Sequence, residues 1–521
     1  METPTDVQSL ATSSDADTAP FSRLVSVVNW RLIATALSLF LLFVVLLAIV
    51  QWGTPALVGT DGYYHARMGL LIREQGLKPD FEWLPLTILS SESFYDHHLL
   101  YHAYLSLFAG RDPVIDAGRS MTQGIKLASL IMPALAFMAV WWLLRTLKVR
   151  WAAVWTLGLF VVSEAFLYRM SMPRAQSASL LVLALGLYAL FSGRHWLLAP
   201  LGFLYVWLYD AFPLLLVAGV VYIVATWLTE RRFAWQALAF PAAGIALGLV
   251  LNPYYPQNIP FILNHLLPKI GDSTTQVGNE WYPYRSWTLV ENSGFALAAF
   301  VLGALAWSWR KERIDRSGLT LFLLTVLFGL LLFRSRRFVE YFPAFALLFA
   351  AVSLSGLYEG LMAGRKRWPI VAPALLALIL VGPLALTLSQ ARESVGRSKA
   401  ADQYAQAAIW LADNSSPGQM VFQTDWDDFP RLFFYNDSNI YTAGLDPTYM
   451  ELKDADLFAE WRAVTRGEVD RPGEVIRDRF GASYVFTDLD HDAFIEQASE
   501  DPLLEELYRD EYAAIFGVAT D

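Results

Sequence analysis

About eleven long apolar stretches, joined by polar connections, fill the chain between residues 32 and 390. A helix that crosses a bilayer needs roughly 20 predominantly apolar residues, because in lipid the backbone must form its hydrogen bonds internally. Only 17% of the 521 residues are charged, whereas soluble domains carry about a quarter. The pattern predicts a polytopic α-helical membrane protein with about 11 spans. We place them at Leu32–Val50, Leu127–Leu144, Trp151–Tyr168, Ala178–Phe191, Trp196–Tyr209, Ala211–Leu228, Phe233–Leu251, Phe295–Trp309, Leu319–Phe333, Val339–Leu357 and Pro369–Leu388.

Lysine and arginine gather in alternate connections between these segments. Such residues are retained on the cytoplasmic side of a membrane. We therefore predict a multi-pass protein of the cell (inner) membrane with a cytoplasmic N-terminus, and we interpret the polar residues 1–31 as a disordered leader. The basic connections lie at 145–150, 194, 231–232, 310–316 and 365–367.

The predicted outer side carries two long loops, 51–121 and 252–293, and a tail, 391–521, outside the membrane domain 32–390. In the tail, QMVFQTDW and ASYVFTDL have the pattern of buried strands that end in acidic turns, and AFIEQAS and LFAEWRAV that of helices. The tail is therefore predicted to be a small extracytoplasmic α/β domain. The lack of cysteine excludes disulfides, and the net charge of −10 does not favour nucleic acid.

An acidic residue follows the first span closely. Asp61 lies in GTDGYYHARMG, where Tyr64, His65 and Arg67 give a predicted interfacial helix a polar face. Tyrosine at this depth is an ordinary membrane anchor, but an ionisable residue at the membrane suggests function. The alternative interpretation is that Asp61 only solvates the helix exit.

A second motif in the same loop, FYDHHLLYH, combines a carboxylate with several imidazoles. Asp96, His97 and His98 are residue types that suit a divalent metal. The alternative is an amphipathic helix that lies on the membrane surface.

Arginines at two predicted outer helix ends oppose the usual charge bias of membrane proteins. Arg169 and Arg174 lie in YRMSMPRAQS, and Arg334, Arg336 and Arg337 lie in FRSRRFVEYFP. Guanidinium groups bind phosphate in bidentate fashion, so we predict an anionic ligand such as a phosphate. The alternatives are pairing with acids such as Glu340 or with lipid headgroups.

Two further stretches carry candidate residues. Glu280 and Trp281 lie in the long outer loop, within VGNEWYPYR, and long loops are often functional. Asp425, Asp427 and Asp428 crowd one turn after a predicted strand, where they repel each other unless a cation or a donor is near.

In layout, these features resemble the catalytic subunits of oligosaccharyltransferases, within the GT-C membrane glycosyltransferases. The resemblance covers nearly the whole chain in order, and it implies that Asp61 in TDGYYHAR is the first catalytic aspartate. It implies that Glu280 is the glutamate of the mobile outer loop, and that one of the three arginines at 334–337 lies near the donor phosphate. DWDDFPRLFFYND resembles the Trp-Trp-Asp stretch, with Trp426 and Asp427 as its last two members.

The resemblance also implies a divalent metal, Mg²⁺ or Mn²⁺, and acceptor or loop contacts. Candidate metal ligands are Asp61, Asp96, His97, His98 and Glu280, and candidate acceptor or loop contacts are Tyr64, His65, Trp281, Trp426 and Asp427.

The sequence departs from the family at two points. Asp425 replaces the first Trp, which helps to hold the serine or threonine of a glycosylation sequon. The turn MPRAQS lacks the family's second acidic pair, so either Asp96 and its histidines replace the missing ligands or Arg169 and Arg174 supply the positive charge.

The favoured hypothesis is a membrane glycosyltransferase that moves a sugar or glycan from a polyprenyl phosphate or diphosphate to a protein, lipid or glycan acceptor on the outer face. Within that class, the alternative to oligosaccharyltransferase-like transfer is transfer of a single sugar from a polyprenyl monophosphate to a lipid or polysaccharide. A transporter predicts charges midway along helices, which the segments lack. A non-catalytic envelope scaffold is the remaining alternative.

Overall fold

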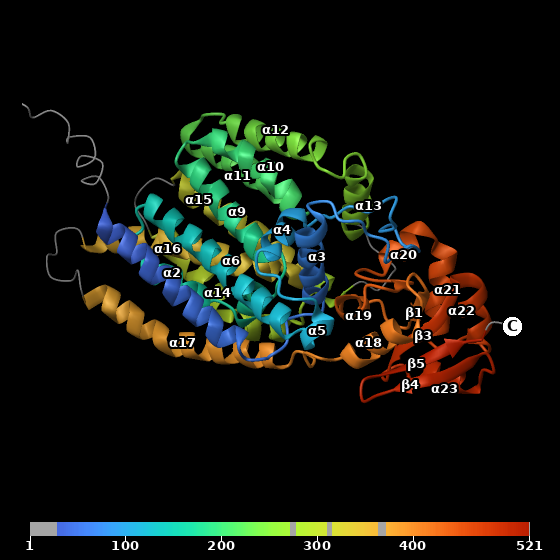
Figure 1. The fold of residues 1–521 in the computed structure, drawn as a ribbon. Helices are drawn as coiled ribbons and strands as arrows, with labels where there is room; N and C mark the ends of the chain where they lie inside the picture. The colour runs from blue at the N-terminus through green and yellow to red at the C-terminus, as the bar shows by residue number, and fades with distance from the viewer. Residues whose placement is uncertain (1–28, 271–277, 310–314, 363–370, 520–521) are drawn as a thin grey trace, which may run out of the picture.

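The structure, a computed structural model, describes residues 29–270, 278–309, 315–362 and 371–519. Nearly all of the expected leader 1–31 and most residues of the basic connections 310–316 and 365–367 lie outside the described residues. Within them, a long helical part is followed by a smaller domain that contains a sheet (Figure 1).

Each predicted span coincides with a helix or a pair of consecutive helices. Five helices are long and apolar enough to cross a membrane, or six when one bent pair is included, and four shorter apolar helices accompany them within the described residues. The helices of this part are α2 (Trp30–Gln51), α6 (Arg119–Thr146), α7 (Ala152–Leu157), α8 (Glu164–Ser171), α9 (Gln176–Phe191), α10 (Leu198–Leu208), α11 (Pro213–Glu230), α12 (Gln236–Val250), α14 (Ser286–Ser308), α15 (Arg316–Arg334), α16 (Phe342–Met362) and α17 (Val371–Gly396), with the 3-10 turns η1 (Gly158–Phe160), η2 (His195–Leu197) and η4 (Arg336–Glu340).

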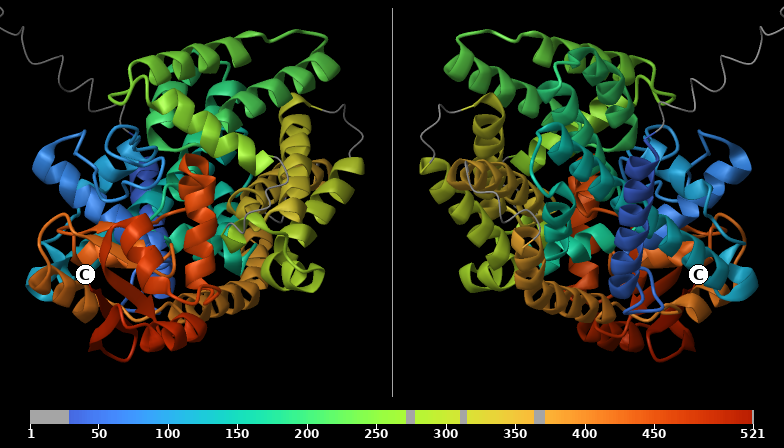
Figure 2. Two further views of the ribbon diagram at one scale, coloured as in Figure 1. Left: turned by 90° about the vertical axis from the view of Figure 1, so that its right-hand side faces the viewer. Right: turned by 90° about the vertical axis from the view of Figure 1, so that its left-hand side faces the viewer.

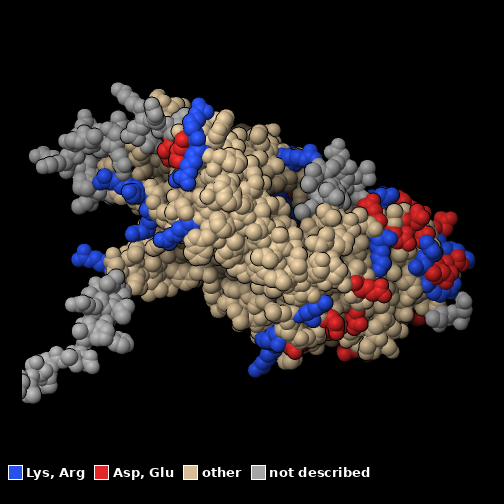
Figure 3. Space-filling view, turned by 90° about the horizontal axis from the view of Figure 1, so that it is seen from above, with Lys and Arg blue, Asp and Glu red and all other residues tan. Residues whose placement is uncertain are grey.

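The outer surface of the helical part is apolar. On α2, Leu37, Leu41 and Val45 are each more than half exposed, at 57%, 53% and 56%, while Phe43 on the opposite face is fully buried. A continuous apolar stripe of this kind suits a lipid environment and would be unfavourable in water. Figure 3 shows a wide band almost without charge between two charged ends. The polytopic membrane architecture predicted from the sequence is therefore confirmed.

Two of the predicted segments differ from straight spans. The segment predicted at Trp151–Tyr168 bends by 84° between residues 160 and 164, where the Ser163 hydroxyl accepts a hydrogen bond from the Phe166 N–H and caps a new helix. The segment expected from Phe295 begins earlier, at Ser286, and is kinked at Ser293. The turn that follows α8 lies against the start of α3, where Pro173 approaches Gly62.

The polar segments between the spans form their own helices. These are α3 (Asp61–Gln75), α4 (Leu99–Ser106) and α5 (Pro113–Asp116) in the first loop, and α13 (Asn258–Ile270) and the 3-10 turn η3 (Asn279–Trp281) in the second. In Figure 1 the first-loop helices lie between the membrane helices and the C-terminal domain, and the left view of Figure 2 looks at the same molecule with the C-terminal domain facing the viewer.

The C-terminal domain contains a five-stranded mixed sheet in the order β2-β1-β3-β5-β4. Strands β1, β2 and β3 are parallel, and β5 pairs antiparallel with β3 and β4. The strands predicted in QMVFQTDW and ASYVFTDL are β1 and β3. The elements are α18 (Ala405–Asn414), β1 (Met420–Gln423), α19 (Phe429–Tyr435), β2 (Ile440–Tyr441), α20 (Thr448–Lys453), α21 (Ala455–Thr465), α22 (Pro472–Phe480), β3 (Ala482–Asp488), α23 (Asp492–Glu500), β4 (Leu504–Arg509) and β5 (Ala513–Val518).

Helix α19 attaches this domain to α3. The rings of Tyr63 and Phe434 meet edge to face with centroids 5.1 Å apart, and Trp83 donates a hydrogen bond of 2.7 Å to the Asp437 carbonyl. Most of these side chains are buried. The C-terminal domain is therefore packed directly against the helix that begins at Asp61.

Candidate active site

Asp61 is the first residue of α3, and its carboxylate points toward the turn between α8 and α9. Gly62 explains the close approach, because a Cβ at this position would lie 2.5 Å from Pro173 Cγ. The turn therefore contacts the first turn of α3, and Arg174 Nη1 lies 3.2 Å from Asp61 Oδ2. An acidic residue is also favoured at this place by the positive end of the helix dipole.

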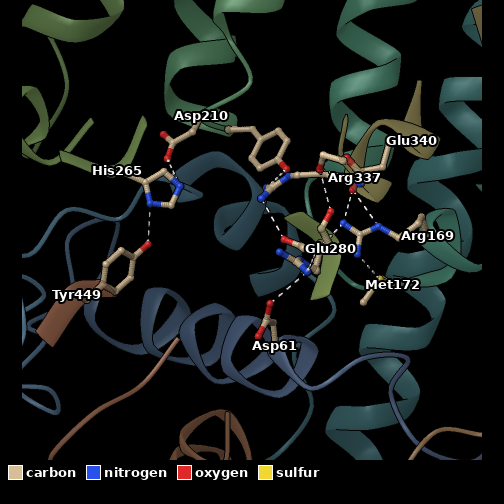
Figure 4. Close-up of polar contacts among 12 residues, drawn as sticks. Asp61, Arg169, Met172, Asp210, His265, Glu280, Arg337, Glu340 and Tyr449 are labelled. Atoms are coloured by element: carbon tan, nitrogen blue, oxygen red, sulfur yellow. Dashed lines mark hydrogen bonds and ion pairs between the residues drawn. The ribbon is translucent and has the colours of Figure 1, made fainter. Parts of the chain in front are cut away.

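Three arginines from different segments converge on Glu280 (Figure 4). Arg337 Nη1 lies 3.0 Å from Glu280 Oε1. The other carboxylate oxygen, Oε2, lies 2.9 Å from Arg169 Nη2 and 3.3 Å from Arg174 Nη1. Arg169 comes from α8, Arg174 from the following turn and Arg337 from η4. We call Asp61, Glu280, Glu340 and these three arginines the Glu280 cluster.

Residues behind the arginines fix their directions. Glu340 is fully buried and accepts a hydrogen bond of 2.9 Å from Arg169 Nε. Arg337 donates to the Tyr209 hydroxyl and lies over the Trp281 ring, 4.7 Å from its centroid. The guanidinium groups are therefore held on two sides.

The loop that carries Glu280 is tied to the 335–337 turn. The Ser335 hydroxyl donates a 2.9 Å hydrogen bond to the Glu280 carbonyl, and the Arg336 N–H donates one of 3.0 Å to the Tyr282 carbonyl. Arg336 itself lies over the Tyr284 ring, and Arg334 ends α15 with an exposed side chain. Of the three predicted arginines at 334–337, only Arg337 joins the Glu280 cluster.

The pKa values of the two catalytic candidates, Glu280 and Asp61, are shifted in opposite directions. Burial alone would raise the pKa of Glu280, but Arg174, Arg169 and Arg337 together hold it well below its usual range. For Asp61, burial raises the pKa, and Glu280 adds to that effect while Arg174 opposes it. Glu280 is therefore firmly ionised, whereas Asp61 accepts a proton more readily than an ordinary aspartate does.

The histidine motif forms a buried hydrogen-bonded chain beneath this site. Asp96 Oδ2 and His102 Nδ1 are 2.8 Å apart, and His102 Nε2 lies 2.7 Å from His65 Nδ1. The His98 ring stacks on Tyr209, with centroids 5.4 Å apart, and the His97 ring stacks on Phe261. Burial lowers the pKa values of His65 and His98 well below the ordinary value, so both are neutral.

The predicted acceptor contacts in the C-terminal domain lie beside the η3 loop. Trp426 Cη2 is 4.0 Å from the position that a Cβ on Gly278 would take. Burial and the neighbouring Asp425 raise the pKa of Asp427 to about 6, and Asp61 also contributes. Tyr64 is buried among rings, including Phe433 of α19 at 6.1 Å and Phe81 at 6.4 Å between centroids, so it packs between α19 and the first outer loop.

A divalent metal does not fit the described residues. No group of three or more His, Asp or Glu side chains is placed to hold an ion within the ranges that the structure describes. Asp96 and the neighbouring histidines bond to one another, and both Glu280 oxygens accept from arginines. The predicted ligands Asp61, Asp96, His97, His98 and Glu280 are not brought together as one donor set.

Sequence reasoning missed two residues of this site, Tyr209 and His102, whereas pairing of the arginines with Glu340 was one of its alternatives and is formed by Arg169. Glu340 is an acid that begins an apolar stretch, and a carboxylate at membrane depth requires a partner. That signal was available in the sequence. Tyr209 carried no signal, because tyrosine at a span end is also an ordinary membrane anchor.

Solved structures of other proteins share this architecture, although comparisons of sequence find no match. No protein-family model and no curated protein sequence matches the chain. Among solved structures, the archaeal oligosaccharyltransferase AglB from Archaeoglobus fulgidus, in complex with an inhibitory peptide and a dolichol-phosphate, has a TM-score of 0.63 at 14% identity. That match covers 91% of this chain and 72% of AglB.

Two other transferases have the same fold. ArnT from Cupriavidus metallidurans, bound to undecaprenyl phosphate, has a TM-score of 0.52 at 14% identity, with 96% of this chain and 98% of ArnT covered. The arabinofuranosyltransferase AftD from Mycobacteria has a TM-score of 0.59 at 13% identity, with 95% of this chain and 40% of AftD covered.

Structural matches at sequence identities this low establish the fold alone. The chain therefore has the fold of the GT-C membrane glycosyltransferases, as the sequence predicted. The fold match to the oligosaccharyltransferase AglB covers 91% of this chain, in which the membrane helices are followed by an α/β domain.

Proposed function

We propose that the chain is a GT-C glycosyltransferase that transfers a sugar or glycan from a polyprenyl phosphate or diphosphate to an acceptor on the outer face. The observation that carries the proposal is the convergence of Asp61, Arg169, Arg174, Glu280 and Arg337 in one site. The site lies where the membrane helices meet the C-terminal domain. A lipid-linked donor presents its phosphate at that depth, because its tail stays in the bilayer.

The reaction follows from these charges. The acceptor forms a bond to the anomeric carbon of the sugar, and the bond from that carbon to the phosphate oxygen breaks. The leaving phosphate gains negative charge, which Arg169, Arg174 and Arg337 neutralise. Asp61 accepts the proton of the acceptor, as its raised pKa favours.

Similar proteins supply a consistent donor chemistry. The structures of AglB and ArnT are described with a dolichol-phosphate and with undecaprenyl phosphate. The residues proposed to contact the acceptor or its loop are Tyr64, His65, Trp281, Trp426 and Asp427. We further propose the orientation predicted from the basic connections, with the N-terminus cytoplasmic and the C-terminal domain extracytoplasmic.

The test is transfer from a lipid extract of the source cells by purified Asp61→Asn protein. Removing the proton acceptor should lower the transfer rate by about 10²–10⁴. The matched control is Asp80→Asn, which makes the same change at an exposed residue of the same loop and should leave the rate unchanged. Wild-type activity in Asp61→Asn would reject the assignment.

A second candidate is transfer of one sugar from a polyprenyl monophosphate to a lipid or polysaccharide. It is favoured by Asp425, which replaces the Trp that the family uses to hold a sequon. The assay should therefore offer a peptide with an Asn-X-Thr sequon and a glycolipid fraction side by side. Label on the peptide supports the first candidate, and label only on the glycolipid supports the second.

A further inference from the structure

Arg174 lies between two carboxylates that belong to different segments. Its Nη1 atom is 3.2 Å from Asp61 Oδ2 and 3.3 Å from Glu280 Oε2. Asp61 and Glu280 are also two of the three acids among the candidate metal ligands predicted from the sequence. A divalent cation held by both would lie between these same two oxygens, since Mg²⁺ and Mn²⁺ prefer carboxylate ligands.

The position of Arg174 is built into the fold. The residue follows Pro173, which is in contact with Gly62, and its N–H donates 2.8 Å to the Met172 carbonyl. The side chain is 14% exposed. The guanidinium is therefore held in place by the turn between α8 and α9.

The charges around it are already balanced. The Glu280 cluster holds three guanidinium groups and three carboxylates, and Glu280 accepts from all three arginines. A divalent ion at this place would face Arg174 and Arg169 at short range, with strong repulsion in a poorly hydrated site.

We propose that Arg174 is a fixed cation in place of the divalent metal, and that transfer by this chain is independent of metal. This inference rests on the proposed function. Arg174 orients Asp61 toward the acceptor and, with Arg169 and Arg337, neutralises the leaving phosphate. The turn MPRAQS lacks the family's second acidic pair and contains Arg174 instead. In this proposal, the positive charge of Arg174 replaces the charge of the metal that those acids would help to bind.

The first measurement needs no donor. Mn²⁺ binding is followed by the EPR signal of free Mn²⁺ for the wild type, Asp61→Asn and Arg174→Asp. The wild type should bind no Mn²⁺ that depends on Asp61. Arg174→Asp adds a third carboxylate beside Asp61 and Glu280, and this variant should gain one Mn²⁺ site. The double variant Arg174→Asp/Asp61→Asn should lose that site again.

The second measurement is transfer with and without EDTA. Wild-type transfer should be unchanged by EDTA, and Arg174→Ala should lower it by about 10²–10³. Arg174→Lys keeps the charge and should recover part of the rate. An Asp61-dependent Mn²⁺ site in the wild type, or loss of transfer in EDTA, would overturn the inference, as would a folded Arg174→Asp protein that gains no site.

The two proposals fail in different ways. A wild type that transfers no sugar from any lipid donor counts against the proposed function, while the Mn²⁺ measurements still decide whether Arg174 replaces the metal. Melting temperatures of the variants separate misfolding from loss of chemistry.

A second, independent feature is a cavity at the opposite end of the membrane helices. It has a volume of about 310 Å³, and its lining includes His195, Tyr222, Thr226, Arg232, Gln236 and Arg316. Helix α11 starts near the Glu280 cluster at Pro213 and reaches Tyr222 and Thr226 of the cavity lining after roughly 14–20 Å along its axis.

The cavity is lined by both aromatic and polar side chains and carries excess positive charge. Arg316 lies over the Tyr222 ring and 3.3 Å from Glu230, and Arg232 forms no ion pair with the described residues. The enclosed Arg316 Nε has no hydrogen-bond partner in the described part of the chain. An enclosed donor without a partner is rare, and it suits an anion.

We infer that this cavity binds a phosphate-bearing anion at the headgroup level of the inner leaflet. Basic hollows between membrane helices on the cytoplasmic side bind anionic lipid headgroups. The shared chemistry is a phosphate, supplied either by an anionic phospholipid or as a free anion.

The test counts cardiolipin retained by the full chain in phosphatidylcholine micelles, using native mass spectrometry. The double variant Arg232→Ala/Arg316→Ala should retain at least about tenfold less cardiolipin than the wild type. Arg145→Ala/Arg150→Ala removes two charges from the same end of the helices and should retain it as the wild type does. Equal loss in both double variants, or equal retention in both at unchanged melting temperature, would overturn the inference. Competition by inorganic phosphate identifies a free-anion site, and its lack identifies a lipid site.

Discussion

Arg67, two turns along the helix that begins at Asp61, forms an ion pair with Asp437 of the C-terminal domain and another of 2.7 Å with Asp112. The Arg67 side chain is only 4% exposed, whereas both acids are about one-third exposed. One buried guanidinium therefore joins two segments of the first outer loop to the C-terminal domain next to the candidate site.

Arg67→Ala should destabilise the junction strongly. The change leaves a cavity and removes the partner of Asp437, and breaking a buried pair costs about 3–5 kcal/mol. The melting temperature of the detergent-solubilised chain measures the loss. Arg479→Ala removes an exposed ion pair with Glu460 and should leave the melting temperature nearly unchanged, because exposed ion pairs contribute little to stability. Similar melting temperatures for the two variants would contradict the structural role of Arg67.

Glu280→Gln should tighten the binding of inorganic pyrophosphate by about tenfold, or about 1.4 kcal/mol. The Glu280 carboxylate competes with a phosphate for the same three guanidinium groups, and the amide removes that competing charge. Isothermal titration of the full chain gives the dissociation constant, and Glu291→Gln at an exposed position of α14 is the matched control. Weaker binding in Glu280→Gln would instead indicate that Glu280 organises the arginines.

The membrane part was predictable because lipid imposes a minimum apolar length on each span. All eleven predicted segments contain helices for that reason. The 84° bend at residues 160–164 was not predictable, since the local sequence remains apolar and Ser163 is compatible with a straight helix. The tail strands were predictable from their apolar runs and acidic ends.

The sequence predicted which types of residue form the candidate site, but only some of the pairs that these residues make. The chain showed arginines at outer helix ends, but spacing could not tell which of Arg334, Arg336 and Arg337 faces inward. That choice depends on η4 and on Tyr209, which are far apart in sequence. The pairing of Arg174 with both Asp61 and Glu280 likewise depends on contacts between segments more than 100 residues apart.

Asp427→Asn should stabilise the chain at neutral pH and have little effect in acid. Burial and Asp425 raise the pKa of Asp427 from its ordinary value of 3.8 to about 6, with Lys399 opposing and Asp61 and Asp488 adding. The folded chain therefore binds a proton that the unfolded chain has lost, and stability falls as pH rises between these two values.

Melting temperatures across this range test the Asp427 prediction. The gain of Asp427→Asn over the wild type should grow from about pH 4 to about pH 6 and then stay constant. Asp470→Asn, at an exposed residue of the same domain, serves as control. A gain that is the same at every pH would show that Asp427 does not titrate in this window.

Gly62→Ala should disturb the candidate site more than it disturbs the fold. The new Cβ would lie 2.5 Å from Pro173 Cγ, so the turn must move, and Arg174 moves with it. Overpacking of this kind costs about 1–3 kcal/mol, and a displaced Arg174 loses its position between Asp61 and Glu280. Transfer should therefore fall by a larger factor than the change in melting temperature suggests.

Gly382→Ala is the matched control for Gly62→Ala. Gly382 lies within α17, and a Cβ there meets no atom within 4 Å. Alanine is the better helix former by about 0.5–1 kcal/mol, so this variant should melt at the same or a slightly higher temperature and retain full transfer. If Gly62→Ala behaves in the same way, the contact between α3 and the 172–174 turn does not fix Arg174, and the geometric basis of the Arg174 inference is lost.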